Sequence, residues 1–326
     1  MKILFSADWH IKLGQKNVPR EWQKNRYKLL FKKIHAMSAT DVHILGGDVF
    51  DTLPKPDEMA LFFEFVAGCT VRTIIYDGNH EATRKGQTFL TFFKDTVREI
   101  NPLVEIVDGI TTYDLGDEDN PSVMVDIIPY THLKTFHNRG DFTSDICCTH
   151  VRGNIAPHVI EEIDLDLFKN WDIVLAGDLH SHSNSQKNII YPGSPLAISF
   201  HRNSIENGVI MYDTDAKDVE FIPLGLPQLI RKTVSSKDEI IKTDYDHTIY
   251  EVTGNILELS DIDSASELID KKLINRESDA VLNLHNLSTE EELRTYFELV
   301  VKLMDNELDD VIKVFNDYND SGLEME

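Results

Sequence analysis

Five segments of the sequence run from a short apolar stretch into side chains that could bind a metal ion. One such group is weak by itself, because a lone histidine is more often structural than a ligand. Five in chain order, each where an apparent strand meets a loop, are too many for chance, and open α/β sheets place their sites at the carboxyl ends of strands. The groups are Asp8 with His10, Asp48 with Asp51, Asn79 with His80, His150 alone, and Asp178 with His180 and His182.

The donor types in these groups indicate which ions would bind. The groups mix carboxylate, amide and imidazole and contain no thiolate. This mixture favours Mn²⁺, Fe²⁺ or Zn²⁺ over a structural zinc knot. We therefore expect divalent ions, with Mn²⁺ as the first candidate, Fe²⁺ or Zn²⁺ as alternatives and Mg²⁺ also allowed.

Asp48 occupies a position from which one side chain could serve two ions. It follows the apolar run Val42 to Leu45 and the break at Gly46-Gly47. A carboxylate at the end of a buried strand is costly unless something positive meets it. Its two oxygens could bridge a metal pair, whose ions lie roughly 3.5–4 Å apart in hydrolytic sites. The alternative, an aspartate that only caps a turn or helix, stays open.

Strands and helices that alternate along the first hundred residues must position these groups. This alternation predicts a layered α/β domain, and from residue 104 onward the pattern shifts to strands. The predicted strands cover 2–5, 42–45, 72–76, 123–128, 145–148, 172–176, 188–191, 208–212 and 219–222, and the predicted helices cover 20–37, 57–67 and 88–100.

The last hundred residues are predicted to form segments separate from the main α/β domain. The segment 223–227 (PLGLP) is a plausible linker, followed by a strand at 248–253 and a helix at 264–273. Ser288 and Glu291 resemble a capping box that opens one last helix over 289–316. The predicted domains are a catalytic domain at 1–225, a small α+β capping or DNA-binding appendage at 226–287, and an acidic C-terminal helix at 288–326.

The composition bounds the class of protein. The 326 residues are 41% hydrophobic and 27% charged, as in a soluble globular protein. No apolar run approaches the roughly 20 residues that span a bilayer, and the start does not read as a signal peptide. Cys69, Cys147 and Cys148 form no paired framework, which indicates a reducing cytoplasm. Cys147 and Cys148 are expected to be buried in a strand.

The charge is strongly negative but unevenly distributed. A net charge of −24 argues against binding nucleic acid through bulk charge. Residues 1–39, however, hold nine Lys or Arg against two Asp or Glu, whereas 289–326 hold three against twelve. A basic N-terminal segment and an acidic C-terminal segment suggest two different binding partners. The alternative is that these charges only lie on solvent-exposed helix faces. The candidate DNA contacts are Lys12, Lys16, Arg20 and Lys24.

Taken together, the motifs resemble a known family. DxH, GDxxD, GNH, a lone histidine and a final GxxH, in this order over 1–222, are similar to the calcineurin-like metallophosphoesterases. The segments MKILFSADWHIKLG, GDVFD, DGNHE and YPGSPL resemble the SbcD-type DNA exonuclease subunit, especially its bacteriophage versions. The resemblance implies an α/β/β/α sandwich with a small α+β appendage and a C-terminal helix.

The resemblance also implies a role for each position. The first metal would be held by Asp8, His10, Asp48 and His180, and the second by Asp48, Asn79, His150 and Asp178. His80 would be catalytic and not a ligand. Asp51 and His182 would orient the ligands without binding a metal themselves. The family usually has GHxH where this chain has Gly177-Asp178-Leu179-His180. Asp178 adds negative charge, so His182 could complete the second site instead.

The implied activity is metal-dependent hydrolysis of DNA phosphodiesters, exonucleolytic on duplex ends and in the alternative endonucleolytic on single strands. The implied partner is an SMC-like ABC ATPase of the SbcC type, with a nuclease homodimer inside a heterotetramer. The last helix or the appendage is a candidate docking segment for that ATPase. Two other functions stay open, namely a phosphoesterase for small nucleotides and a DNA-end-binding subunit with a degraded site.

Overall fold

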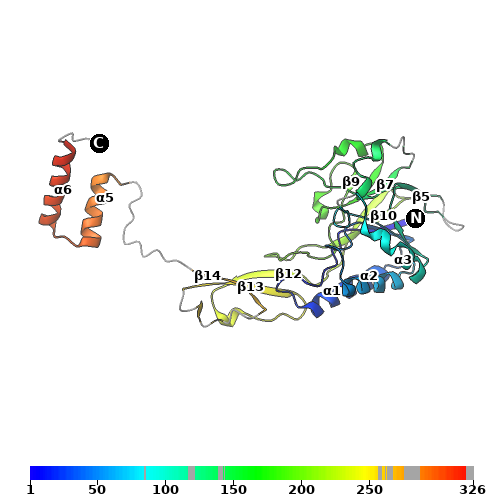
Figure 1. Ribbon diagram of the computed structural model, residues 1–326, viewed down its shortest axis with the longest axis horizontal. Coiled ribbons are helices and arrows are strands. Elements are labelled where there is room, and N and C mark those ends of the chain that lie inside the picture. The colour runs from blue at the N-terminus through cyan, green and yellow to red at the C-terminus, as the bar shows by residue number, and fades with distance from the viewer. Residues whose placement is uncertain are drawn as a thin grey trace. The chain divides into compact units, whose positions relative to one another are not determined.

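The computed structural model describes residues 1–83, 86–116, 122–138, 142, 144–255, 259–260, 262, 267–274 and 287–320. The chain forms two compact units, Met1–Leu273 and Ile274–Glu326 (Figure 1). The predicted helix at 264–273 and the predicted turn at 116–121 fall partly outside the described residues.

A six-stranded sheet carries the first three metal-competent groups. Its order is β11-β10-β1-β2-β3-β4, with β1 to β4 parallel and the other two strands antiparallel. Parallel strands are buried on both faces and need nearly continuous apolar runs, which β1 and β2 supply. The strands are β1 (Lys2–Ser6), β2 (Val42–Gly46), β3 (Arg72–Tyr76), β4 (Val104–Val107), β10 (Gly208–Asp213) and β11 (Asp218–Pro223).

A five-stranded sheet carries the other two groups. Its order is β5-β6-β7-β8-β9, parallel except for β5. Phe5 and Ile44 of the first sheet share one buried apolar cluster with Ile127, Cys148 and Leu175 of the second, so the two sheets pack face to face. The strands are β5 (Thr111–Asp114), β6 (Met124–Ile128), β7 (Ile146–His150), β8 (Ile173–Gly177) and β9 (Ile189–Ile190).

Helices cover the outer faces of both sheets, which confirms the predicted sandwich. Tyr27 and Phe65 pack on the outer face of the first sheet around Leu45. Among the described residues, the outer layer of the second sheet consists of 3-10 helices, where Phe168 packs against Val174. The α-helices are α1 (Arg20–His35), α2 (Pro56–Gly68) and α3 (Lys94–Ile100); the 3-10 helices are η1 (Phe89–Phe93), η2 (Tyr130–His132), η3 (Phe136–Asn138), η4 (Leu165–Phe168), η5 (His182–Asn184) and η6 (Lys237–Glu239).

A three-stranded sheet completes the larger unit, with β12 (Leu229–Val234), β13 (His247–Gly254) and β14 (Ile269–Ile274) in that order. It packs beside the start of α1, where His247 Nε2 lies 2.5 Å from the carbonyl oxygen of Asn17. The helix predicted at 264–273 is wrong over its described part, because residues from 269 onward form β14. Ile269 and Leu273 have the spacing of one helix face, which suggested a helix. Pairing with the neighbouring strand β13 instead makes this segment a strand.

The smaller unit is a helical pair, formed by α5 (Thr289–Tyr296), a π turn at Phe297–Val301 and α6 (Asp305–Asp320). The predicted capping box is confirmed, since Glu291 N–H donates to Ser288 Oγ and Ser288 N–H donates to Glu291 Oε2. The prediction of one continuous helix is wrong because Lys302 adopts a φ of +60° and ends the first helix. No helix among the described residues has the length and apolar character needed to cross a membrane.

Candidate metal centre

Four of the predicted ligand positions have an unusual backbone conformation. The φ angles are +56° at Asp8, +46° at His10, +50° at Asp48 and +100° at Asp178. Left-handed conformations are uncommon for residues other than glycine and concentrate at functional sites. Hydrogen bonds hold the first two loops together, since Asp8 N–H donates to Gly47 O at 3.1 Å and His10 N–H donates to Asp48 O at 2.9 Å.

Two glycines allow the loops after β2 and β3 to approach each other. A Cβ at Gly47 would lie 2.7 Å from backbone atoms of Gly78 and 2.6 Å from His150 Nδ1. A Cβ at Gly78 would lie 2.2 Å from Asp48 Oδ1. Gly47 also has a φ of +85°, which disfavours any side chain there. The glycines of GGD and DGN are therefore needed to bring Asp48 against the neighbouring strand ends.

The carboxylate of Asp48 lies at the centre of the site. Its oxygens are 3.6 Å from His10 Nε2, 3.8 Å from His80 Nε2 and 3.6 Å from His150 Nε2. The side chain is almost completely buried. A carboxylate surrounded by three imidazoles in this way has the position that a bridging ligand requires.

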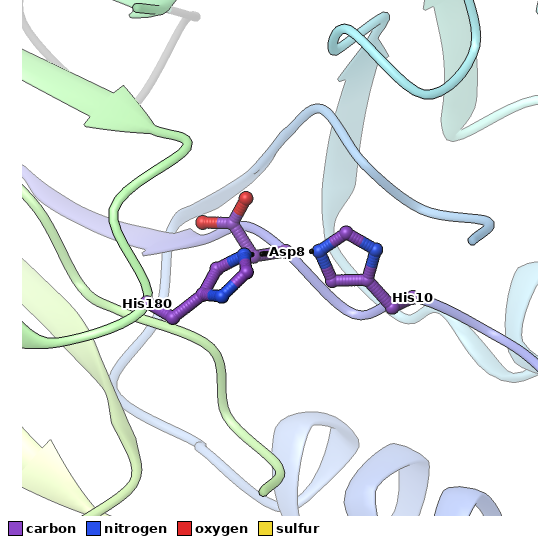
Figure 2. Close-up of side chains that lie close together, drawn as sticks. All are labelled: Asp8, His10 and His180. Carbon is purple, nitrogen blue, oxygen red and sulfur yellow. Dashed lines mark hydrogen bonds between the residues drawn. The ribbon is translucent and has the colours of Figure 1, made fainter. Parts of the chain in front are cut away.

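Within the described part of the chain, three overlapping groups of side chains place their donor atoms within 4.8 Å of one another. Figure 2 shows one of them, in which the rings of His10 and His180 point toward each other beside Asp8. The two Nε2 atoms of these rings lie 3.2 Å apart. The groups are Asp8 with His10 and His180; His10 with Asp48 and His80; and Asp8 with Asp48 and His150.

His150 and Asn79 also lie beside Asp48, with His150 near Oδ1 and His10 near Oδ2. His150 Nδ1 lies 2.9 Å from the carbonyl oxygen of Gly46, and its donation there leaves Nε2 free to face the carboxylates. The Asn79 amide lies 3.0 Å from His150 Nε2. With its nitrogen toward Asp48, the amide donates to both carboxylate oxygens at 3.2 and 3.0 Å. Two members of the predicted second ligand set, Asn79 and His150, therefore lie against the carboxylate of Asp48.

The electrostatics of the site fit a divalent cation. Burial raises the pKa of the Asp8 carboxyl to about 8, and it lowers the pKa of His10 well below the usual range. Burial alone would lower the pKa of His150, but the charges of Asp48, Asp8 and Asp178 outweigh it and raise the pKa to about 9. The buried His10 Nδ1 also has no hydrogen-bond partner among the described residues. A metal ion would displace the protons that are held on Asp8 and His150, and it would bind the neutral imidazole that burial favours at His10.

Asp178 is held differently from the other predicted ligands. Arg152 donates to both of its oxygens, from Nε at 3.2 Å and from Nη2 at 3.3 Å. One of these oxygens lies 4.0 Å from His150 Nε2. The carboxylate of Asp178 therefore lies between the predicted second metal position and an arginine that sequence reasoning did not single out.

His80 and Asp51 are linked as a catalytic histidine and its support would be. His80 Nδ1 lies 2.6 Å from the carbonyl oxygen of Asp51. Donation from Nδ1 leaves Nε2 facing Asp48 and the cavity, and the side chain is 37% exposed. The Asp51 carboxylate contacts Lys12 Nζ at 2.6 Å and lies 3.8 Å from His10 Nδ1.

Glu81 is a second residue that sequence reasoning missed. It is fully buried, and its oxygens accept hydrogen bonds from the backbone N–H groups of Asp48, Phe50 and Gly78 at 2.8–2.9 Å. Burial and the charge of Asp48 raise its pKa to about 8. Its place in DGNHE, directly after His80, was the available signal.

His182 and the candidate DNA contacts lie outside the three ligand groups. His182 stacks on Phe221 with ring centroids 4.6 Å apart, and its Nδ1 lies 2.7 Å from Tyr191 O. Lys12 pairs with Asp51, and Arg20 pairs with Asp57. Lys16 is exposed and Lys24 is half-buried, and no contact defines a role for either.

A cavity of about 800 Å³ opens over the metal-competent side chains. Its lining includes the metal-competent side chains of Asp48, Asn79, His80 and His180. It also includes the apolar side chains of Ile198, Ile205 and Phe221. A cavity with both kinds of lining suits a substrate with a charged group beside an uncharged body.

These observations define a cluster of metal-competent side chains at the carboxyl ends of parallel strands, beside a cavity. A family model for calcineurin-like phosphoesterases matches residues 1–204, and the chain belongs to this family. The predicted resemblance, the predicted enzyme class and the use of divalent metal ions are thereby confirmed.

Three similar proteins indicate which members of this family the chain resembles. The chain is 40% identical to the probable exonuclease subunit 1 of Escherichia phage T5, over 98% of this chain and 100% of that one. It is 25% identical to the SbcD subunit of the nuclease SbcCD from Staphylococcus saprophyticus, over 77% and 74% of the two chains. It is 26% identical to exonuclease subunit 1 of Enterobacteria phage T4, over 68% of each chain.

Proposed function

We propose that this protein is the nuclease subunit of a DNA-processing complex and hydrolyses phosphodiesters with two divalent cations, preferably Mn²⁺. The observation that carries the proposal is the convergence of His10, His80 and His150 on the buried carboxylate of Asp48. The names of the three relatives supply the substrate class, because all three are nuclease or exonuclease subunits.

The chain's own residues would divide the work of hydrolysis. Asp8, His10, Asp48 and His180 would hold one cation, and Asp48, Asn79 and His150 the other, with Asp178 beside it. Cations held there would lower the pKa of a water molecule and neutralise phosphoryl oxygens. His80, fixed through Nδ1 by Asp51 O, would present Nε2 to the phosphate or the leaving oxygen. The apolar side chains in the cavity lining would help to limit the access of other water molecules.

DNA would approach along the surface that surrounds the cavity. The three-stranded sheet packs against Ala197, next to the cavity residue Ile198, so the appendage adjoins the active-site opening. Lys16 and Lys24 form no ion pair with any described residue, whereas Lys12 and Arg20 already face carboxylates. A small nucleotide would need none of these surfaces. We therefore propose DNA rather than a small nucleotide as the substrate.

The C-terminal helical pair is the candidate docking segment for an ATPase subunit of the SbcC type, within a complex that holds two nuclease chains. Val300, Val301, Met304 and Val314 are exposed there, with Met304 at 71%. A helical pair that leaves apolar side chains exposed suits a partner helix or coiled coil. The resulting complex would act in the cytoplasm, which is the host cytoplasm if a phage encodes it.

Nuclease assays would test the proposal directly. Labelled duplex and single-stranded DNA would be incubated with Mn²⁺ or Mg²⁺, with and without the ATPase, beside nucleotide substrates. We expect Mn²⁺-dependent cleavage of DNA ends, and exclusive hydrolysis of small nucleotides would refute the nuclease. Full DNA binding without turnover under any metal would favour an end-binding subunit.

The docking role needs a separate experiment. A chain lacking residues 289–326 should lose association with the ATPase while it retains Mn²⁺-dependent hydrolysis of a small phosphodiester. A Met304→Asp variant of the full chain should weaken association without a change in the melting temperature. Unchanged association in the truncated chain would assign docking to another surface.

A further inference from the structure

Arg152 is the only arginine or lysine among the described residues that line the cavity. The other charged residues of the lining are Asp48, Asp178 and Glu206. A cavity that admits a phosphodiester therefore contains one permanently charged cation, and this cation lies beside the ligand cluster. Its side chain is 41% exposed, so it can reach a bound molecule.

Two carboxylates fix the position of Arg152. Asp178 accepts from Nε at 3.2 Å and from Nη2 at 3.3 Å, which sets the plane of the guanidinium. Glu162 accepts from the backbone N–H at 3.1 Å. Asp178 is nearly buried, at 7% exposure of its side chain, and cannot swing away with the arginine. The guanidinium is therefore held in one orientation before a substrate arrives.

The remaining hydrogen-bond donors of Arg152 are available for a ligand. A guanidinium has five N–H groups, and Asp178 uses two of them. Among the described residues, Asp178 is the only side-chain partner that the guanidinium contacts. Arginine binds phosphate through two parallel hydrogen bonds, and such charge-assisted bonds are stronger than neutral ones.

We propose that Arg152, oriented by Asp178, binds a non-bridging oxygen of the substrate phosphodiester. The inference rests on the proposed function in that the ligand is a phosphodiester, but it assigns a substrate-binding residue that the ligand pattern does not contain. In this arrangement Asp178 acts chiefly as a positioning residue for the arginine. The pair also adds no net charge to a cluster that already contains Asp8 and Asp48.

The test uses the Mn²⁺-loaded full chain and three readouts. These are KM and kcat for bis(4-nitrophenyl) phosphate, the affinity for inorganic phosphate by titration calorimetry, and the number of bound Mn²⁺ ions by equilibrium dialysis. The variants are Arg152→Ala, Arg152→Lys and Asp178→Asn. Arg72→Ala is the matched control, because Arg72 pairs with Glu105 at 3.1 Å and does not line the cavity.

Arg152→Ala should raise KM and weaken phosphate binding by about 10- to 100-fold, the effect of losing a hydrogen bond to a charged group. Bound Mn²⁺ should not change. Arg152→Lys should retain part of the affinity, since it keeps the charge but not the planar fork. Asp178→Asn should weaken phosphate binding less than Arg152→Ala does.

Two results would overturn the inference. Unchanged KM and phosphate affinity in Arg152→Ala would make the ion pair structural, and loss of Mn²⁺ in proportion to phosphate affinity would make it a support of the metal site. Failure of the proposed nuclease function would give a different set of results from failure of this inference. In that case the wild-type chain leaves DNA intact, while the calorimetric effect of Arg152→Ala on phosphate binding is still measurable.

Discussion

Glu81 accepts a hydrogen bond from the backbone N–H of Asp48 at 2.9 Å, which joins the loop after β3 to the loop after β2. The same carboxylate accepts from Phe50 and Gly78, so it satisfies three buried backbone donors. Asp48 has a positive φ, and this network compensates for that unfavourable conformation. Glu81 therefore positions the central carboxylate of the site without belonging to the predicted ligands.

Replacement of Glu81 by alanine should strongly destabilise the protein. Each buried donor left without a partner costs roughly 1–3 kcal/mol, so we expect a loss of several kcal/mol in the free energy of unfolding. Glu81→Gln keeps one acceptor oxygen and should cost less. Urea unfolding would measure both, with Glu99→Gln as a control at an exposed position that should change stability by less than about 0.5 kcal/mol. Equal effects of Glu81→Ala and the control would contradict the role.

The contribution of Asp8, Glu81 and His150 to the stability of the metal-free protein should fall as the pH rises from about 4 to about 9. Asp8 and Glu81 have folded-state pKa values of about 8, and His150 has one of about 9, all above their ordinary values. A raised pKa stabilises the fold below the ordinary value, and this contribution is lost as the pH passes the folded-state value. Mn²⁺ would replace the protons, so its stabilising effect should grow with pH.

Melting temperatures between pH 5 and 9, with EDTA or with Mn²⁺, would measure this dependence. The difference between the two series should be small at pH 5 and largest near pH 9. An Asp48→Ala variant serves as the control, because it should lose most of the Mn²⁺-dependent shift. Parallel curves with and without Mn²⁺ would show that the raised pKa values are unrelated to a metal centre.

Much of the fold and the site could be predicted because the informative residues are local. Strands such as 42–46 are mostly apolar runs, and the residues that follow them carry the metal-competent side chains. Contacts between residues far apart in the chain could not be predicted from the sequence. Arg152 is 26 positions from Asp178, and nothing in either segment indicates that they pair. The strand β14 was missed because its spacing of apolar residues also fits a helix.

His80→Asn should reduce kcat by about 10²- to 10⁴-fold, the range for loss of a positioned acid or base. KM and the number of bound Mn²⁺ ions should change little, because His80 is predicted to be catalytic and not a ligand. Its exposure of 37% and its bond to Asp51 O support this separation. The measurement is steady-state hydrolysis of bis(4-nitrophenyl) phosphate together with metal analysis. Loss of bound Mn²⁺ in His80→Asn would instead make His80 a ligand, as its membership in one of the three donor groups would allow.

Gly78→Ala should remove metal binding even though it adds only one methyl group. The new Cβ would lie 2.2 Å from Asp48 Oδ1 and 2.5 Å from Asp48 N, so the loop that carries the central carboxylate would have to move. Gly109→Ala is the matched control, because a Cβ there meets nothing within 4 Å. Equilibrium dialysis with Mn²⁺ should show a large loss of affinity in the first variant and none in the second. If Gly78→Ala bound Mn²⁺ like the wild type, Asp48 would not be the residue on which the metal centre depends.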